Sequence, residues 1–156
     1  MKNKIIDKEK LAEICEGFRK EGKTIVTCNG SFDLFHFGHL IFLEEAKEQG
    51  DVLIVGLNSD TSINQYKSPD RPVIPQEMRS QILAALEFVD YVYIFDETTP
   101  DAFLEIVKPN IHVNGEEYTE ECIEKETVEK NGGKIYLVKR KAGFSTTELI
   151  AKIKGM

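Results

Sequence analysis

The feature that most constrains the fold of this chain is a near-continuous apolar run at residues 51–57, with the sequence Asp-Val-Leu-Ile-Val-Gly-Leu. A strand that is apolar on both faces is typical of a parallel sheet that helices cover on both sides. Four shorter apolar segments, at residues 24–28, 91–95, 111–114 and 134–138, are expected to be further strands of the same sheet. The sequence thus predicts a parallel sheet of five strands.

The segments between the expected strands have the features of helices. Asp7 is a suitable N-terminal cap for a first helix, because apolar residues follow it at helical spacing. Pro75 suits the first turn of a central helix that runs to about Val89, with Met78 and Ile82 expected to face inward. Further helices are expected at residues 38–49, 99–109 and 119–130 and from Ser145 onward, and residues 58–71 are expected to form a polar loop. This alternation predicts an α/β fold with right-handed crossovers, as a single doubly wound domain over residues 1–156.

The composition limits the partners and the location of the chain. Its net charge of -7 argues against a nucleic-acid partner, because proteins that bind nucleic acids need a basic face. The three cysteines, Cys15, Cys28 and Cys122, include no CxxC pair, which suits a reducing compartment better than a disulfide framework or a zinc site. The chain has no signal-peptide pattern and no apolar run near the ~20 residues of a membrane span. We therefore expect a cytoplasmic protein with no membrane partner.

One segment combines several features of a phosphate-binding site. It leaves the first expected strand at Asn29, contains Gly30 and Gly38, and leads into a helix, with His36 and His39 on either side of Gly38. Glycine lets the backbone approach a ligand closely, and a helix N-terminus offers unpaired N–H groups and a positive dipole end. The two imidazoles could both donate hydrogen bonds to phosphate oxygens during a transfer reaction. The segment therefore predicts phosphate chemistry.

Two other interpretations of the histidine pair remain open on the sequence alone. His36 and His39 could be structural, as isolated histidines near a helix start often are. They could also bind a metal ion, but a zinc site needs three or four good ligands and His112 is the only other histidine. The combination of strand, glycine-containing loop, histidine pair and helix is more specific than any of its parts.

The segment from Asn29 to His39 resembles the signature of the cytidylyltransferase-like nucleotidyltransferases, which contain an HxGH motif. Further similarities follow in order along the chain. They are the basic loop with Lys67 and Arg71, the helix-start residue Arg79, the acidic turn from Asn114 through Gly115 and Glu117 to Tyr118, and the C-terminal signature with Gly143, Phe144, Ser145, Thr146 and Thr147. The resemblance extends over nearly all of residues 24–153. It is strongest to the heptose 1-phosphate adenylyltransferase domain of the ADP-heptose synthases, and glycerol-3-phosphate cytidylyltransferase is a more distant likeness.

The resemblance implies a five-stranded parallel sheet of order 3-2-1-4-5, with Gly30 and Gly115 on the two sides of one crevice. It implies attack by a substrate phosphate oxygen on the α-phosphorus of ATP or CTP, with Mg²⁺ bound to the triphosphate and pyrophosphate released. The residues implied to act in catalysis are His36, His39, Lys67 and Arg79. Those implied to bind the nucleotide are Asn29, Gly30, Ser31, Phe32, Asp33, Gly38, Asn114, Gly115, Glu117, Ser145, Thr146 and Thr147.

Some residues have alternative roles that the sequence leaves open. Arg71 is implied to bind the phosphorylated acceptor, although with Lys67 it could also lie in a solvated loop. Asp33 could hold the metal ion, or it could cap the backbone of its own turn. Ser145 and Glu148 form a capping box, which would explain both residues without a substrate. The basic residues Lys139, Arg140 and Lys141 could add positive charge to the site or could simply be solvated.

The chain departs from the heptose adenylyltransferase pattern at two places. Asn114 replaces a lysine, and residues 124–127 replace a small glycine-containing segment. Transfer of AMP to D-glycero-β-D-manno-heptose 1-phosphate is the leading hypothesis, and cytidylyl transfer to glycerol 3-phosphate or another phosphorylated alcohol or sugar is the alternative. A nucleotide sensor without turnover and a fragment of a tRNA-charging enzyme are rival hypotheses, which the paired histidines and the acidic charge respectively oppose. A homodimer is a further expectation.

Overall fold

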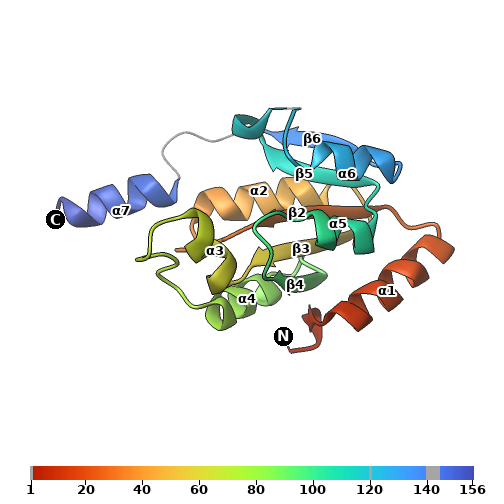
Figure 1. The fold of residues 1–156 in the computed structure, drawn as a ribbon, viewed down its shortest axis with the longest axis horizontal. Coiled ribbons are helices and arrows are strands. Elements are labelled where there is room, and N and C mark those ends of the chain that lie inside the picture. Colours follow the sequence, from red (N-terminus) through yellow and green to blue (C-terminus); the bar gives the residue numbers. More distant parts are fainter. Residues whose placement is uncertain (1, 120, 140–144) are drawn as a thin grey trace.

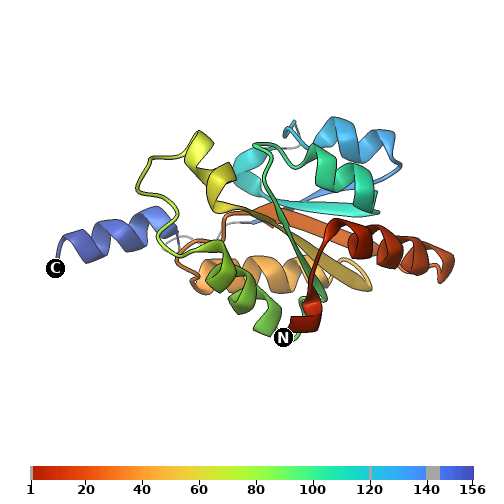
Figure 2. The same ribbon diagram turned by 60° about the horizontal axis from the view of Figure 1, so that its bottom comes forward.

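The computed structural model describes residues 2–119, 121–139 and 145–156 of the chain. Helices pack against both faces of one parallel sheet (Figures 1 and 2). The strands are β1 (Ile5–Ile6), β2 (Ile25–Gly30), β3 (Val52–Asn58), β4 (Tyr91–Phe95), β5 (Ile111–Gly115) and β6 (Lys134–Val138). The helices are α1 (Lys8–Lys20), α2 (Phe37–Lys47), α3 (Asp60–Tyr66), α4 (Gln76–Ala85), α5 (Asp101–Val107), α6 (Lys125–Lys130) and α7 (Thr146–Lys154), with short 3₁₀ turns η1 (Lys2–Lys4) and η2 (Glu116–Tyr118).

The sheet corrects the prediction of five strands. In the described part of the chain it has six parallel strands in the order β1-β4-β3-β2-β5-β6. The additional strand is β1, whose residues Ile5 and Ile6 pair with Val92 and Tyr93 at one edge. Two residues are too few to produce an alternating pattern, so the sequence did not reveal this strand. In the rest of the order β2 is central between β3 and β5, which brings the carboxyl ends of β2 and β5 together.

Two apolar clusters cover the two faces of the sheet. On one face Leu43 of α2 and Leu83 of α4 pack with strand residues that include Leu53. On the other face Leu11 of α1 and Phe103 of α5 belong to a second cluster. Strand β3 contributes to both clusters and every one of its residues is buried, which confirms the expectation from its apolar sequence.

Helix α4 is rotated relative to the prediction. Met78 and Ile82, which were expected to face inward, are 60% and 40% exposed, whereas Arg79 and Leu83 are buried. Residues 78 and 82 lie on a stripe next to the one formed by residues 79 and 83, because successive helical residues are separated by about 100°. The sequence pattern favoured the apolar stripe, but the polar contacts of Arg79 turn the neighbouring stripe inward.

Two further segments differ from the prediction. The polar stretch 58–71 contains α3, which is capped by the Ser59 hydroxyl and buries Ile63 as its one large apolar side chain. The helix expected at 119–130 is shorter, because only Lys125–Lys130 is α-helical. In both segments few apolar residues are spaced at the helical period, so the pattern could not fix the boundaries.

The last helix, α7, begins where the sequence predicted. The hydroxyl of Ser145 accepts a hydrogen bond from the backbone N–H of Glu148 at 3.1 Å, as an N-terminal cap does. None of the residues of α7 is buried, and the helix extends away from the sheet (Figure 1). No helix in the three described ranges is long and apolar enough to cross a membrane.

Candidate active site

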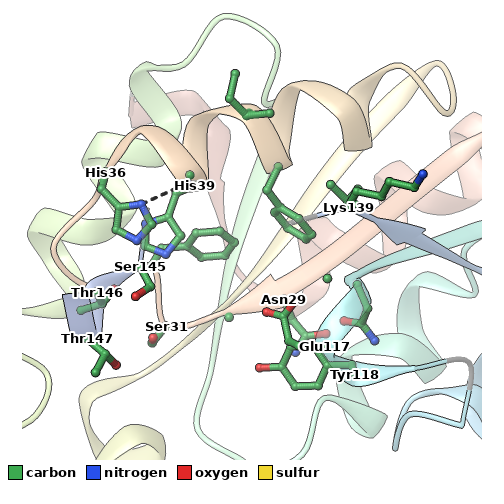
Figure 3. Close-up of a pocket in the computed structure, with 18 of the residues that line it drawn as sticks. Asn29, Ser31, His36, His39, Glu117, Tyr118, Lys139, Ser145, Thr146 and Thr147 are labelled. Carbon is green, nitrogen blue, oxygen red and sulfur yellow. Dashed lines mark hydrogen bonds between the residues drawn. The ribbon is translucent and has the colours of Figure 1, made fainter. Parts of the chain in front are cut away.

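A cavity of about 360 Å³ lies at the carboxyl ends of β2 and β5, between the start of α2 and the start of α7 (Figure 3). Most of the residues that were predicted to form a site line it. These are Asn29, Gly30, Ser31, Phe32, His36, Gly38, His39, Lys67, Asn114, Gly115, Glu117, Ser145, Thr146 and Thr147. Asp33, Arg71 and Arg79 were also predicted but are not among the lining residues. The predicted site residues did not include the apolar wall of Ile41, Phe42 and Val138, since apolar residues carry no chemical signal in a sequence.

The two predicted histidines lie together at the N-terminus of α2. His36 is the N-cap residue, and its Nδ1 accepts a long hydrogen bond of 3.4 Å from the backbone N–H of His39. The two imidazole rings are stacked, with their centroids 3.8 Å apart and their planes inclined by 19° (Figure 3). Both rings line the cavity beside a helix N-terminus, which favours an anion at this point.

The imidazole of His39 lies in an environment that disfavours its protonated form. Its pKa is lowered to about 3, mainly by burial and also by the charges of His36 and Lys67, against an opposite effect of Asp33. Its Nδ1 is buried without a hydrogen-bond partner among the described residues. His39 is therefore neutral at pH 7 in this state. A bound anion would raise its pKa by supplying the missing negative charge.

Lys67 extends into the cavity from the loop that follows α3. Its ammonium group donates to the Ser31 hydroxyl at 3.1 Å, so the basic loop meets the turn after β2. Burial and the nearby Arg71 guanidinium lower the pKa of Lys67. These contacts place a cation beside the histidine pair, as the prediction of a phosphate-binding loop requires.

Asp33 fastens the basic loop to the turn after β2. Its side chain is 1% exposed and accepts hydrogen bonds from the backbone N–H groups of Leu34, Val73 and Ile74 at 2.9–3.0 Å. It also accepts from Nε of Arg71 at 2.8 Å. Burial alone would raise the pKa of Asp33, but the backbone donors and the Arg71 guanidinium lower it overall. These contacts favour the interpretation of Asp33 as a local anchor.

The arrangement does not fit a metal site built from protein side chains. Both carboxylate oxygens of Asp33 are engaged with hydrogen-bond donors, and Arg71 lies against one of them. Among the residues that the structure describes, no three His, Cys, Asp or Glu side chains form a group that could hold a metal ion. The geometry therefore gives no support to a metal bound by the histidine pair.

The structure places Arg79 behind the cavity wall. Its side chain is fully buried and is not among the residues that line the cavity. The guanidinium donates to the carbonyl oxygens of Ser31, Asn58 and Ile74 and to Oδ1 of Asp60, the last at 2.7 Å. One cation thus joins the cavity-lining turn at Ser31 to the end of β3 and to both helices that flank the basic loop. These contacts hold the turn after β2 and the basic loop in place.

A buried polar wall lies behind the end of β5. The Thr27 hydroxyl and Nδ1 of His112 are 2.8 Å apart, and Nδ2 of Asn114 donates to Oε2 of Glu124 at 3.1 Å. Burial lowers the pKa of His112, while the Glu124 carboxylate and the Asn114 side chain act in the opposite direction. The contact between Asn114 and Glu124 joins the two places where the sequence departs from the family pattern.

The start of α7 completes the cavity wall opposite β5. The Thr146 hydroxyl donates to the backbone carbonyl oxygen of Asp33 at 3.2 Å, which connects this helix to the histidine turn. Ser145 and Thr147 also line the cavity (Figure 3). The predicted contributions of Arg140, Lys141, Gly143 and Phe144 lie outside the described residues, and Lys139 lines the cavity.

The chain is similar in sequence to two bacterial proteins of the same name. "Bifunctional protein HldE" from Syntrophotalea carbinolica is 45% identical over 97% of this chain, and the protein of the same name from Geobacter metallireducens is 48% identical over 96%. The chain spans 31% of the length of each of these relatives.

Two crystal structures have the same fold. The lipopolysaccharide core biosynthesis protein from Thermoplasma volcanium superposes with a TM-score of 0.60 and 29% identity, over 77% of this chain and 98% of the other. Pantoate-beta-alanine ligase from Francisella tularensis gives a TM-score of 0.64 at 20% identity, over 96% and 76% of the two chains, which supports the fold alone. The sequence profile of the cytidylyltransferase-like proteins matches residues 27–152, and the chain belongs to this family of nucleotidyltransferases.

Proposed function

We propose that this chain transfers AMP from ATP to a heptose 1-phosphate and releases pyrophosphate, with residues 1–156 acting as one catalytic domain. The observation that carries the proposal is the stacked pair of His36 and His39 at the N-terminus of α2, inside a cavity that Lys67 also enters. The heptose acceptor is supported by identities of 45–48% to HldE proteins over nearly the whole chain. The similarity to a lipopolysaccharide core biosynthesis protein is consistent with a sugar acceptor.

The proposed reaction is a single displacement at phosphorus. A phosphate oxygen of the acceptor attacks the α-phosphorus of ATP, the bond from that phosphorus to the bridging oxygen breaks, and pyrophosphate leaves with the electron pair. Charge on the non-bridging oxygens is stabilised by N–H donors of His36 and His39 and by the ammonium group of Lys67. ATP is proposed to arrive with Mg²⁺ on its phosphates, which would neutralise part of the triphosphate charge.

The low pKa of His39 supports this role. A neutral imidazole can accept or donate without the cost of a buried positive charge, and the negative charge of a bound triphosphate would favour protonation of the ring. The start of α7, with the Thr147 hydroxyl and the backbone N–H groups of its first turn, offers a second set of donors to the same phosphates. Two helix N-termini therefore face one cavity.

A second candidate is cytidylyl transfer to glycerol 3-phosphate or another phosphorylated alcohol or sugar. It is favoured by the presence of Asn114, where the heptose adenylyltransferase pattern has lysine. The same histidine turn would serve either nucleotide, because the phosphates of ATP and CTP are identical.

A panel of ATP and CTP against several phosphorylated acceptors, with Mg²⁺ and pyrophosphate release as the readout, tests the proposal. We expect release from ATP with heptose 1-phosphate and none without an acceptor. Pyrophosphate release with CTP only would establish the second candidate. Tight nucleotide binding without pyrophosphate release from any combination would favour a sensor. Sedimentation of the same sample tests the homodimer that we also propose.

A further inference from the structure

The cavity has two chemically different ends (Figure 3). At one end His36, His39 and the start of α7 provide hydrogen-bond donors, which suit phosphate oxygens. At the other end lie the Glu117 carboxylate and the phenol ring of Tyr118, together with Asn114. A carboxylate repels phosphates, whereas an exposed aromatic ring offers a face on which a flat base can stack. A nucleotide with its phosphates at the first end therefore places its base at the second.

Asn114 is the residue of this second end whose orientation is fixed. It ends β5 next to Gly115, lines the cavity and is 5% exposed. Its Nδ2 donates to Oε2 of Glu124, a carboxylate that is 3% exposed and does not line the cavity. The amide nitrogen therefore points away from the cavity, and the amide oxygen lies on the other branch of the side chain.

The carboxylate of Glu124 prevents the Asn114 amide from turning over. A reversed amide would bring its oxygen against the carboxylate oxygen, and two acceptors in a buried place repel each other. Glu124 thus determines which atom of Asn114 is presented to a ligand.

We infer that Glu124 is a positioning residue that holds the Asn114 oxygen toward the base, so that the site selects nucleotides with an exocyclic amino group over those with a keto group. The inference rests on the proposed nucleotidyl transfer. Adenine and cytosine carry an amino group that can donate to Oδ1 of Asn114. The keto oxygen of hypoxanthine or uracil would face that oxygen with no hydrogen between them.

The test compares binding of matched nucleotides by titration calorimetry with the purified chain. ATP and ITP differ in the group at the 6-position, amino or keto, and CTP and UTP differ in the same way at the 4-position. We expect the keto partner of whichever pair binds to be about tenfold weaker or more. Equal affinity within the pair would overturn the inference while leaving nucleotide binding intact. Failure of all four nucleotides to bind would overturn both the inference and the proposed function.

Variants then assign the selection to Glu124. In Glu124→Gln either orientation of the Asn114 amide finds a partner, so we expect the ATP-to-ITP affinity ratio to fall about fivefold or more. Asn114→Ala removes the oxygen itself and is expected to lower the ratio in the same way. Glu121→Gln is the matched control, because Glu121 is on the same segment but 80% exposed, and it should keep the wild-type ratio.

The outcomes separate positioning from a general structural role. A variant that only loosened the fold would weaken ATP and ITP alike and would not change their ratio. A wild-type ratio in folded Glu124→Gln and Asn114→Ala would overturn the inference. If either variant fails to fold, the comparison of ATP with ITP on the unmodified chain still decides whether an acceptor faces the base.

Discussion

The hydroxyl of Thr146 donates a hydrogen bond to the backbone carbonyl oxygen of Asp33, although the two residues are 113 positions apart in sequence. The carboxylate of Asp33 meanwhile binds Arg71 and the backbone of Val73 and Ile74. One residue therefore holds the histidine turn, the basic loop and the start of α7 in a single arrangement. A substitution of Asp33 should therefore loosen the histidine turn, the basic loop and the start of α7 together.

The first prediction concerns Asp33→Asn. The substitution removes the charge that pairs with Arg71, so we expect the basic loop to detach from the turn and the KM for nucleotide to rise about tenfold. Trypsin should then cut faster after Lys67, which mass spectrometry of the fragments would measure. Arg71 precedes proline and is not a trypsin site, so cleavage in the loop reports on Lys67.

The second prediction separates stability from catalysis at Arg79. Arg79→Met leaves three carbonyl oxygens and Asp60 without their buried partner, and we expect a loss of about 3 kcal/mol in the free energy of unfolding. Urea unfolding would measure this loss. Arg19→Met is a suitable control, because within the described part of the chain the Arg19 side chain donates to one carbonyl oxygen, that of Val107, and its loss should cost about 1 kcal/mol. A stable but inactive Arg79→Met protein would instead support the catalytic role that the family resemblance implies for Arg79.

The third prediction concerns the histidine that faces the cavity. His39→Ala removes one preorganised donor, and we expect turnover to fall by about 10²–10³ with little change in Tm. Pyrophosphate release and thermal unfolding measured on the same preparation would test both parts. Turnover equal to that of the unmodified chain would refute the role of His39 in transfer.

The fourth prediction is an acid sensitivity that arises from buried histidines. The pKa of His112 in the folded chain lies below its unfolded value of about 6.5, so below that pH the unfolded state binds a proton that the native state does not. Stability should therefore fall as the pH drops from 7.5 to 5.5, by about 1 kcal/mol for this residue. His39 acts in the same direction.

Urea unfolding of His112→Gln at both pH values would isolate the contribution of His112. The variant is expected to be less stable at pH 7.5, because it alters the contact with Thr27, but to lose less on acidification. An identical loss in variant and wild type would show that His112 takes up its proton in the folded state.

Local sequence patterns predicted the central strands well, because an apolar run such as β3 has few alternatives. They predicted the cavity through residues whose chemistry is specific, such as His36 and Gly38. They could not show which three-dimensional contacts a polar residue makes. Arg79 has the same sequence signal whether it meets a phosphate or backbone carbonyls, and only the packing of α4 shows which carbonyls it reaches.

The same limit applies to Asp33. A carboxylate in a turn before a histidine pair is compatible with a metal ligand or an anchor, and the donors that decide the matter come from residues some 40 positions later. The contact between Asn114 and Glu124 is also invisible in the sequence, since nothing there shows that two departures from a pattern touch each other.

Helix α7 buries none of its residues, yet its first turn forms part of the cavity wall. Its removal from that wall would leave both apolar clusters of the sheet intact, because neither includes any of its side chains. Part of the binding free energy of a triphosphate between α2 and α7 would therefore be used to hold α7 in place. Displacement of α7 would then open the phosphate end of the cavity without disturbing the packing of the sheet.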